Sequence, residues 1–473
     1  MKKSAKFLSV VLSILVMLSA LIPASAVSVW DSYWENTTEA QRGIIVQPGS
    51  NESERNFSWY MRAHETECAV KISTDPLMTD AITFKGDEIS DRHGSNVAKV
   101  TVTGLQENTT YYYTCVTEKK ESEIYSFTTD DDTFSALYMS DIHISFDEEA
   151  LSAQATAYDF ADLLAEVTDK HDVNILLSAG DQATDGLLEE YKGFTFSPVS
   201  RSLTIATAIG NHDRKGIAYK YFTNLPNEDE GMISSPQGGN YYFTKGEVLF
   251  LVIDGNNASA TDHRNFISKA VKENSDLKWR VVLMHQDMYG GTIEGRESEN
   301  NLLRLILSPI FDEFNIDLVL TGHSHHYSIS DVVYNGKTVC EIENGGTVNN
   351  AEGTVYMVSA SVGRPREEEG GIMYSDLISI GMEEYSDKLY NIIDFSPDAI
   401  TVTTYERGSD EVYVSFSLTK DDDFSGREIS PIRLLLGKLF GAIGTIYAVF
   451  NNIGRYSDLT EDGFNVDFFE TVF

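Results

Sequence analysis

Five short apolar segments in the middle of the chain each end in a polar loop that contains Asp, Asn or His. They span residues 136–139, 174–177, 203–206, 280–284 and 317–320. Between the first two, residues 148–169 have the pattern of an amphipathic helix. Apolar runs that alternate with helices predict an α/β domain with buried strands. Because functional residues of such domains usually lie at strand ends, the five loops predict a functional site.

The five loops supply seven candidate metal ligands and two candidate catalytic residues. The candidate ligands are Asp141, His143, Asp181, Asn211, His285, His323 and His325. The candidate catalytic residues are His212 and Asp213. Each residue alone has a structural explanation, because an Asp after a strand is often a helix cap and a His is often a hydrogen-bonded core residue. The ordered set of five loops favours the functional explanation.

The chemistry of these side chains indicates a metal centre. Carboxylate, imidazole and amide groups suit borderline and hard metal ions, and the set contains no thiolate. His323 and His325, two residues apart at a strand end, can direct their rings to different ions while one carboxylate bridges the ions. Asp181 is the candidate bridge. Two ions about 3.5 to 4 Å apart can hold a phosphoryl group and share a hydroxide whose pKa they lower towards neutrality.

In front of this region, residues 37–130 contain short strand-like segments separated by turns, without helical periodicity. Residues 105–113, with the pattern Leu-x-x-x-Thr-x-Tyr-x-Tyr, resemble a stretch of fibronectin type III domains. We therefore expect an all-β sandwich with Trp59 in its core. Cys68 and Cys115 both lie in this segment, and the sequence is compatible either with a disulfide between them or with buried free thiols.

The motifs Asp-x-His, Gly-Asp-x-x, Gly-Asn-His-Asp, a strand-end His and Gly-His-x-His occur in this order between residues 134 and 363. They resemble those of the calcineurin-like metallophosphoesterases, and the expected fold is a two-sheet α/β sandwich flanked by helices. The resemblance implies one metal at Asp141, His143, Asp181 and His325, and a second at Asp181, Asn211, His285 and His323. It also implies that His212 donates a proton to the leaving oxygen or stabilises the transition state, and that Asp213 orients His212 through a hydrogen bond.

The resemblance further implies a hydrolase that acts on phosphate esters. The expected reaction is in-line attack on phosphorus by a hydroxide bound to the dinuclear metal centre, without a covalent enzyme intermediate. We expect small phosphomonoesters as substrates. Two alternatives stay open, a phosphodiesterase on the same metal core and a non-catalytic surface-binding module. The complete set of seven ligands argues against the second alternative.

Together with the front segment, the motifs resemble the purple acid phosphatase branch, but one ligand differs. The tyrosine that binds ferric iron in that branch is replaced by Thr184. We therefore expect no purple colour, and two ions drawn from Fe, Mn and Zn, with Mn, Zn or Fe(II) favoured over Fe(III). The first metal site looks complete without the tyrosine because His143 is present.

The loop after His285 also departs from the branch. The histidine pair of the plant enzymes is absent from residues 286–301. Gln286, Asp287 and Tyr289 begin this loop, and the two glycines that follow predict a flexible rim or lid over the site. We therefore expect substrate contacts that differ from those of the plant enzymes.

The first 26 residues have the pattern of a secretory signal peptide. Three lysines precede an apolar run over residues 7–22, and small residues precede an expected cleavage after Ala26. We therefore expect a secreted or extracellular protein. The formal net charge of −37 argues against nucleic acid or an anionic surface as its partner.

Residues 134–420 are expected to form the catalytic domain, and residues 421–473 a linker and an apolar tail. The sequence Asn335-Gly336 predicts a hairpin turn near the middle of the domain's second half. The apolar part of the tail, residues 432–453, contains Arg433 and Lys438 and is marginal as a membrane span. Three roles fit it: a helix docked on the protein, an interfacial segment that holds the protein at a cell surface, and a partner-binding helix.

Overall fold

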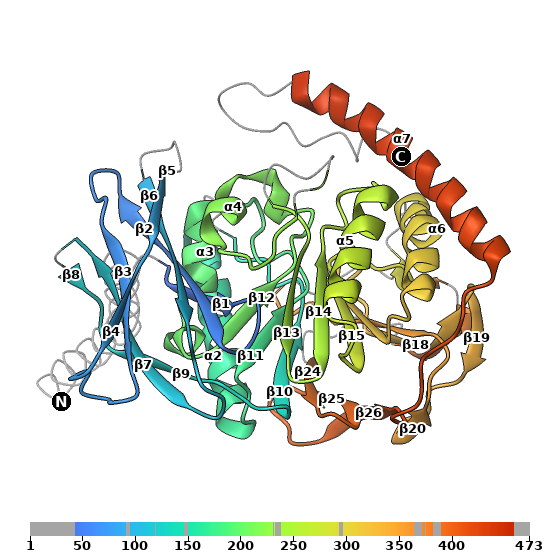
Figure 1. Cartoon of the computed structure of the whole chain (residues 1–473), viewed down its shortest axis with the longest axis horizontal. Helices are drawn as coiled ribbons and strands as arrows, with labels where there is room; N and C mark the ends of the chain where they lie inside the picture. Colours follow the sequence, from blue (N-terminus) through green and yellow to red (C-terminus); the bar gives the residue numbers. More distant parts are fainter. Residues whose placement is uncertain are drawn as a thin grey trace, which may run out of the picture.

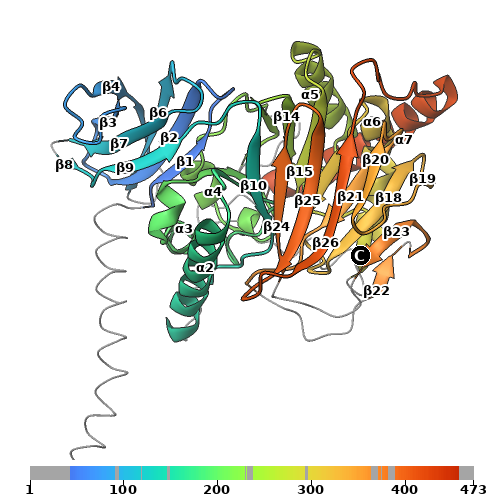
Figure 2. The ribbon, with the colours of Figure 1, turned by 90° about the horizontal axis from the view of Figure 1, so that it is seen from below.

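The computed structural model describes residues 43–90, 95–118, 120–145, 150–229, 231, 238–292, 297–363, 371–373, 375–381 and 389–457. The predicted signal peptide lies outside these residues. The chain forms a small β-rich front domain and a larger α/β domain beside it (Figures 1 and 2). A long helix near the C-terminus, α7 (Pro431–Ser457), lies on the side of the larger domain that faces away from the front domain.

The front domain consists of two antiparallel sheets. The first has the order β1 (Ile45–Pro48), β2 (Glu54–Arg62), β6 (Ser95–Thr103), β5 (Asp87–Ser90). The second has the order β4 (Ile82–Lys85), β3 (Cys68–Ser73), β7 (Thr110–Thr117), with β8 (Lys120–Glu121) and β9 (Tyr125–Thr128) both paired to β7. The predicted all-β sandwich is thus confirmed.

The core of the front domain is aromatic and aliphatic. Trp59 is buried there with Phe57, Val70 and Tyr113, and its indole nitrogen donates to Thr117 Oγ1 at 2.8 Å. Of the two alternatives for the cysteines, the structure has the free thiols: no disulfide joins Cys68 and Cys115 among the described residues. Burial raises the pKa of the Cys115 thiol, so this side chain acts as a small core residue.

The larger domain contains two packed sheets, as predicted. The first has the order β12 (Thr204–Thr207), β11 (Ile175–Ser178), β10 (Phe134–Met139), β24 (Leu389–Phe395), β25 (Ala399–Glu406), β26 (Val412–Thr419), β20 (Gly346–Asn349). The second has the order β13 (Tyr241–Lys245), β14 (Val248–Ile253), β15 (Trp279–Met284), β17 (Leu318–Thr321), β21 (Thr354–Val358), β18 (Ser328–Tyr334), β19 (Lys337–Cys340), with β23 (Ile378–Gly381) paired to β18. A short ribbon pairs β16 (Gly290–Thr292) with β22 (Gly371–Met373).

Alternation along each central strand explains the layers. In β10, Ala136 and Tyr138 face the core between the sheets, whereas Leu137 and Met139 face the helices on the outside. The outer face of the first sheet is covered by α2 (Ala150–Lys170), α3 (Leu188–Phe194) and α4 (Ala218–Phe222). The outer face of the second sheet is covered by α5 (Ala260–Glu273) and α6 (Glu297–Glu313). Strands that are buried on both faces have continuous runs of apolar residues, and these runs allowed the strands to be predicted from the sequence.

The two domains share a buried polar interface. Arg55 Nε donates to Thr204 Oγ1 at 3.2 Å, and the ammonium of Lys245 lies 2.9 Å from Glu52 and 2.7 Å from Asp130. Each buried charge therefore has an opposite charge or a hydrogen-bond partner, as burial requires. These pairs fix the front domain against β12 at the edge of the first sheet and β13 at the edge of the second.

The predicted hairpin turn is confirmed, since Asn335 and Gly336 both have positive φ and join β18 to β19. The apolar tail forms α7, which contacts α5 and α6. No helix in the described part of the chain has the length and apolar character needed to cross a bilayer.

Candidate metal centre

The nine predicted site residues follow strands of both sheets, and the structure brings them to one edge of the domain. Loops after β10, β11 and β12 carry Asp141, His143, Asp181, Asn211, His212 and Asp213, and loops after β15 and β17 carry His285, His323 and His325. Backbone hydrogen bonds join the loops directly: Asp141 N donates to Gly180 O at 3.1 Å, and Gly322 N donates to His285 O at 2.9 Å. The site is thus a single cluster at the seam between the sheets.

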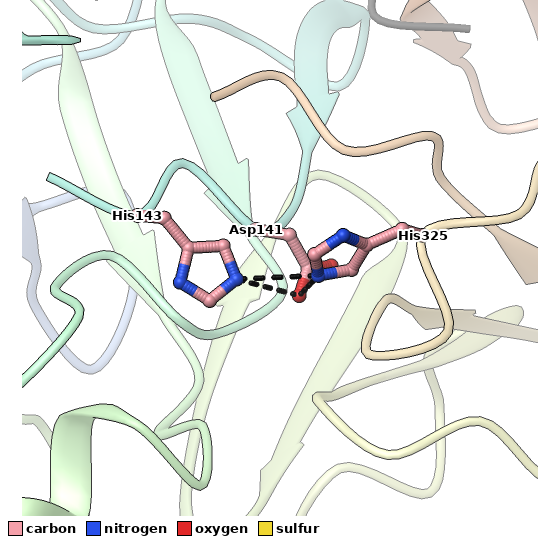
Figure 3. A group of neighbouring side chains, drawn as sticks. All are labelled: Asp141, His143 and His325. Carbon is pink, nitrogen blue, oxygen red and sulfur yellow. Dashed lines mark hydrogen bonds and ion pairs between the residues drawn. The ribbon is translucent and has the colours of Figure 1, made fainter. Parts of the chain in front are cut away.

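The first group of ligand atoms consists of Asp141, His143 and His325 (Figure 3). Asp141 Oδ1 lies 3.1 Å from His325 Nε2 and 3.7 Å from His143 Nε2. The two Nε2 atoms are 3.2 Å apart. All three side chains are buried, so their ligand atoms converge on one small volume.

The second group consists of Asp181, Asn211, His285 and His323. His285 Nε2 lies 3.1 Å from Asp181 Oδ2, 3.0 Å from Asn211 Oδ1 and 3.2 Å from His323 Nδ1. Asp181 Oδ2 also lies 3.7 Å from His143 Nε2 in the first group. Asp181 therefore stands between the two groups, where the sequence analysis placed a bridging carboxylate.

Five of these residues have left-handed backbone conformations. The φ angles are 55° for Asp141, 50° for His143, 52° for Asp181, 73° for His323 and 64° for His325. Non-glycine residues rarely adopt such angles, and each costs about 1–3 kcal/mol unless its surroundings hold it. Their concentration in one cluster is typical of a functional site, where chain geometry is set by the side chains that must converge.

Glycines in the motifs permit the close approach of the loops. A Cβ atom on Gly210 would lie 2.0 Å from Asp181 Oδ1, and one on Gly322 would lie 1.7 Å from Ser140 Oγ and 2.3 Å from Asp141 Oδ2. The glycines next to the candidate ligands are therefore required by packing against the carboxylates themselves.

Replacing Gly210 by Ala is expected to lower metal affinity at least about tenfold, because the new methyl group must displace Asp181. Metal content after dialysis against a metal buffer measures this. Gly336→Ala is the control, because Gly336 has positive φ but, in the part of the chain that the structure describes, no atom lies within 4 Å of its Cβ position. It is expected to cost about 1 kcal/mol of stability and to leave metal affinity unchanged. Equal metal content in both variants would contradict the packing argument.

Hydrogen bonds outside the cluster orient its members. His285 Nδ1 donates to Ala179 O at 2.9 Å, which leaves Nε2 as the lone-pair nitrogen that faces Asp181. The backbone N–H of His323 donates to Asp141 Oδ2 at 2.9 Å, and that of His212 donates to Asp181 Oδ1 at 2.8 Å. Each carboxylate thus has one oxygen held by the backbone and the other directed towards the imidazoles.

The carboxylates of Asp141 and Asp181 are ionised in this environment. Burial alone would raise the pKa of Asp181, but the His285 and His212 rings outweigh it and hold this pKa far below its ordinary value. A similar balance, with His325 as the main neighbour, holds the pKa of Asp141 well below its usual range. Burial lowers the pKa of His285, yet the Asp181 carboxylate raises it to about 10. Two buried negative charges therefore attract either protons or metal ions to the imidazoles.

The residues present fit a metal centre. Asp141 Oδ1 is buried and has no neighbour among the described residues with the geometry of a hydrogen bond, although two imidazole nitrogens face it. A buried carboxylate oxygen left in this state is costly unless a cation lies beside it. The donor set of carboxylate, imidazole and amide oxygen matches Mn, Fe or Zn ions.

The predicted hydrogen bond between Asp213 and His212 is wrong. The Asp213 carboxylate accepts hydrogen bonds from Gly210 N at 2.8 Å, Ala183 N at 3.1 Å and Tyr191 Oη at 2.8 Å. His212 has helical φ and ψ angles and precedes a 3₁₀ turn, so consecutive side chains there point in different directions. Asp213 therefore ties the 183 and 210 loops together.

His212 is oriented by Thr184 in place of Asp213. The Nδ1 atom of His212 lies 2.7 Å from Thr184 O, and because a carbonyl only accepts, Nδ1 carries hydrogen and Nε2 carries the lone pair. Burial lowers the pKa of His212 to about 4, and Asp181 partly opposes this shift. The Thr184 hydroxyl donates to His143 O at 3.3 Å, so the residue that replaces the expected tyrosine forms a hydrogen bond with the backbone.

Two positions near the site were missed by the sequence analysis. Lys215 Nζ lies 3.0 Å from His212 Nδ1 and 3.5 Å from Asp185 Oδ1. Because residues three apart in a 3₁₀ turn lie above one another, the spacing from His212 could have indicated it. Asn256 Nδ2 lies 3.4 Å from Gly210 O and Asn256 Oδ1 accepts from Gln286 at 2.9 Å, which no local pattern in the sequence indicates.

The predicted flexible rim after His285 is also wrong at its start. Gln286, Asp287 and Tyr289 are buried, and β16 pairs with β22. A Cβ atom on Gly290 would lie 2.3 Å from Ser328 Oγ, so this glycine permits close packing. The remaining part of this loop, residues 293–296, lies outside the described residues.

Two family models match the chain. The model described as calcineurin-like phosphoesterase matches residues 134–327, and the model described as purple acid phosphatase, N-terminal domain matches residues 41–129. An uncharacterized protein of Mycobacterium tuberculosis strain H37Rv is 32% identical over 146 residues, which is 26% of this chain and 27% of that protein. Purple acid phosphatase 1 of Ipomoea batatas is 35% identical over 75 residues, 15% of this chain and 16% of that enzyme.

Solved structures show the same fold. A purple acid phosphatase from yellow lupin seeds superposes with a TM-score of 0.65 at 14% identity, covering 82% of this chain and 76% of that enzyme. The structure of PhoD superposes with a TM-score of 0.54 at 12% identity, covering 86% of this chain and 98% of that protein. The fold prediction, an all-β domain followed by a two-sheet metallophosphoesterase sandwich, is confirmed.

Proposed function

We propose that this protein hydrolyses phosphomonoesters with two bound metal ions, because residues 134–327 form a calcineurin-like phosphoesterase domain that follows a purple acid phosphatase N-terminal domain. The cluster of six buried Asp and His side chains with the half-buried Asn211 carries the proposal. Asp141, His143, Asp181 and His325 would hold one ion, and Asp181, Asn211, His285 and His323 would hold the second. Bound there, the ions would neutralise phosphoryl oxygens and lower the pKa of a water molecule at the site.

The chain itself supplies orientation and proton control. Asp181 Oδ1 is held by the His212 backbone and its Oδ2 faces His285 and His143, so the carboxylate is placed before substrate arrives. The ring of His212 lies edge-on to that of His143, with centroids 4.8 Å apart, and its Nε2 carries the lone pair. A phosphate ester brings negative charge near this ring and raises its pKa. His212 can then hold a proton at Nε2 for the leaving oxygen.

One observation supports a small substrate and a second supports a monoester. Acidic residues outnumber basic ones by 73 to 36, which disfavours polyanionic substrates. The residues that would distinguish a monoester from a diester lie in loops outside the shared motifs, and the purple acid phosphatase relative is the ground for choosing the monoester.

We also propose that the protein is secreted. The support is the pattern of residues 1–26, in which lysines, an apolar run and small residues succeed one another. N-terminal sequencing of the exported protein tests this, and Val27 is the expected first residue.

The proposed activity is tested by elemental analysis of the purified protein together with hydrolysis of p-nitrophenyl phosphate and bis-p-nitrophenyl phosphate. We expect two metal ions per chain, turnover of the monoester, and no purple colour even with iron bound, because Thr184 replaces the tyrosine ligand. Preferential turnover of the diester would establish the phosphodiesterase alternative. A protein that stays inactive and metal-free after addition of Mn, Zn and Fe would favour the non-catalytic binding module.

A further inference from the structure

Helix α7 is attached to the domain through polar and ionic contacts near its start. The guanidinium of Arg433 pairs with the Asp312 carboxylate and with Asn335. Its Cζ atom also lies 5.6 Å from the centre of the Tyr334 ring. These contacts fix the first turn of α7 against α6 and the β18–β19 hairpin.

Further along, α7 approaches α5 and α6 through glycines. A Cβ atom on Gly437 would lie 2.8 Å from Pro309 Cβ, and one on Gly444 would lie 3.0 Å from Ile306 Cγ2. Thr445 Oγ1 accepts from the Thr261 backbone N–H at 3.2 Å. Apart from Leu434, the docked face of α7 is therefore made of small and polar residues.

The opposite face of α7 is apolar and exposed, which is the reverse of the usual arrangement in a docked helix. The exposed residues and their exposed fractions are Ile432 72%, Leu435 67%, Leu436 45%, Leu439 55%, Ile443 56% and Ile446 56%. Apart from the adjacent Leu435 and Leu436, they are spaced three or four residues apart, so they form one continuous stripe along the helix. Figures 1 and 2 place α7 on the outside of α5 and α6, at the edge of the molecule. We call these six residues the α7 stripe.

The charges on α7 differ from those of the rest of the chain. Its 27 residues include Arg433, Lys438 and Arg455 and no Asp or Glu, although acidic residues are twice as numerous as basic ones in the whole chain. At physiological ionic strength, charges more than about 8 Å from a contact are largely screened. The net negative charge, which argued against an anionic surface, therefore does not govern what α7 itself can approach.

We propose that the α7 stripe inserts into the surface of a lipid bilayer, with anionic headgroups favoured by the exposed Lys438 beside the stripe. An interfacial helix of this kind has a purely apolar face and basic residues beside it, and lies in the plane of the membrane. This proposal is independent of the phosphatase activity.

The composition of the stripe favours lipid over a protein partner. Protein interfaces are rich in Trp, Tyr and Arg and make about one hydrogen bond per 100–200 Å². The stripe contains only Leu and Ile, whose side chains form no hydrogen bonds. A second copy of the chain is disfavoured by size, because a stable interface uses about 20–30 residues from each partner, whereas the described side chains of α7 contribute six to the stripe.

The test is flotation with vesicles of phosphatidylcholine, with and without phosphatidylglycerol. All proteins begin at Val27, so that the apolar segment of the signal peptide cannot bind lipid. We expect wild type to float with the anionic vesicles, and the triple variant Leu435→Ser, Leu439→Ser, Ile443→Ser to bind at least about tenfold more weakly. Lys438→Glu is expected to weaken binding to the anionic vesicles alone.

The control is the double variant Leu77→Ser, Ile82→Ser, which removes two apolar side chains of the front domain that are 77% and 64% exposed. It is expected to float like wild type, and thermal unfolding should match for all variants because the substituted side chains lie outside the core. Failure of wild type to float, or equal flotation of the triple variant, would overturn the proposal. Sedimentation without vesicles tests whether the stripe is instead a dimer interface. A wild-type dimer that becomes a monomer in the triple variant would assign the stripe to a second copy of the chain.

Discussion

Asp181→Asn is expected to abolish hydrolysis of p-nitrophenyl phosphate, with a loss in kcat/KM of at least about a thousandfold. The substitution keeps the shape of the side chain and an oxygen that can accept from His212 N at 2.8 Å. It removes the negative charge between the two groups of ligands, where Oδ2 lies 3.1 Å from His285 and 3.7 Å from His143. Without this charge, two cations cannot be held close together in a buried site.

Metal content and thermal stability measure the same loss independently of catalysis. Wild type is expected to contain two ions and to unfold at a higher temperature when metal is added, because an ion that binds the folded state stabilises it. Asp181→Asn is expected to contain at most one ion and to gain less from added metal.

The matched control for Asp181 is Asp287→Asn. Asp287 is a buried carboxyl two residues after His285, and Asn300 Nδ2 donates to its Oδ1 at 3.3 Å. An Asn at this position can still accept that hydrogen bond, so metal content is expected to stay as in wild type. If Asp181→Asn retained both ions and full activity, the assignment of Asp181 as the bridge would be wrong.

The sequence predicted that the residues of the candidate metal centre lie together, because they follow strands whose apolar runs are unmistakable. Asp141, Asp181 and His285 each lie within three residues of a strand end, and strands of a two-sheet domain carry their loops to a common edge. Boundaries differ from prediction by only one or two residues for these strands. The pairing of β13 and β14 was not predicted, although the apolar run of β14 is followed by the polar residues 254–257.

The orientation of His212 could not be predicted, because it depends on a backbone carbonyl. Thr184 O accepts from His212 Nδ1, and because every residue has a backbone carbonyl, the identity of residue 184 gives no indication of this contact.

The face through which α7 docks could not be predicted for a related reason. An apolar helix is normally assumed to dock through its apolar face, but Gly437 and Gly444 allow α7 to approach through its small face. Because these glycines have no side chain, α7 packs closely through them, and the α7 stripe is left on the exposed side of the helix.

His212→Asn is expected to lower kcat about a hundredfold to ten-thousandfold for an alkyl phosphate and to leave metal content unchanged. The Asn amide can replace Nδ1 as a donor to Thr184 O, which lies 2.7 Å from Nδ1 in the wild type, whereas nothing replaces Nε2. The backbone bond from residue 212 to Asp181 is also kept. The variant therefore removes the proposed proton donor without disturbing the ligands.

The dependence on the leaving group distinguishes the two roles of His212. An alkoxide must be protonated as it leaves, whereas p-nitrophenolate is stable without a proton, so a proton donor matters more for the alkyl ester. We expect the loss for glycerol phosphate to exceed the loss for p-nitrophenyl phosphate by at least about tenfold. Equal losses for the two esters would show that His212 stabilises charge on the transferring phosphoryl group, because that charge develops with either leaving group. Asp213→Asn is the control, since Asp213 contacts Gly210, Ala183 and Tyr191 but not His212 among the described residues, and its effect should be the same for both esters.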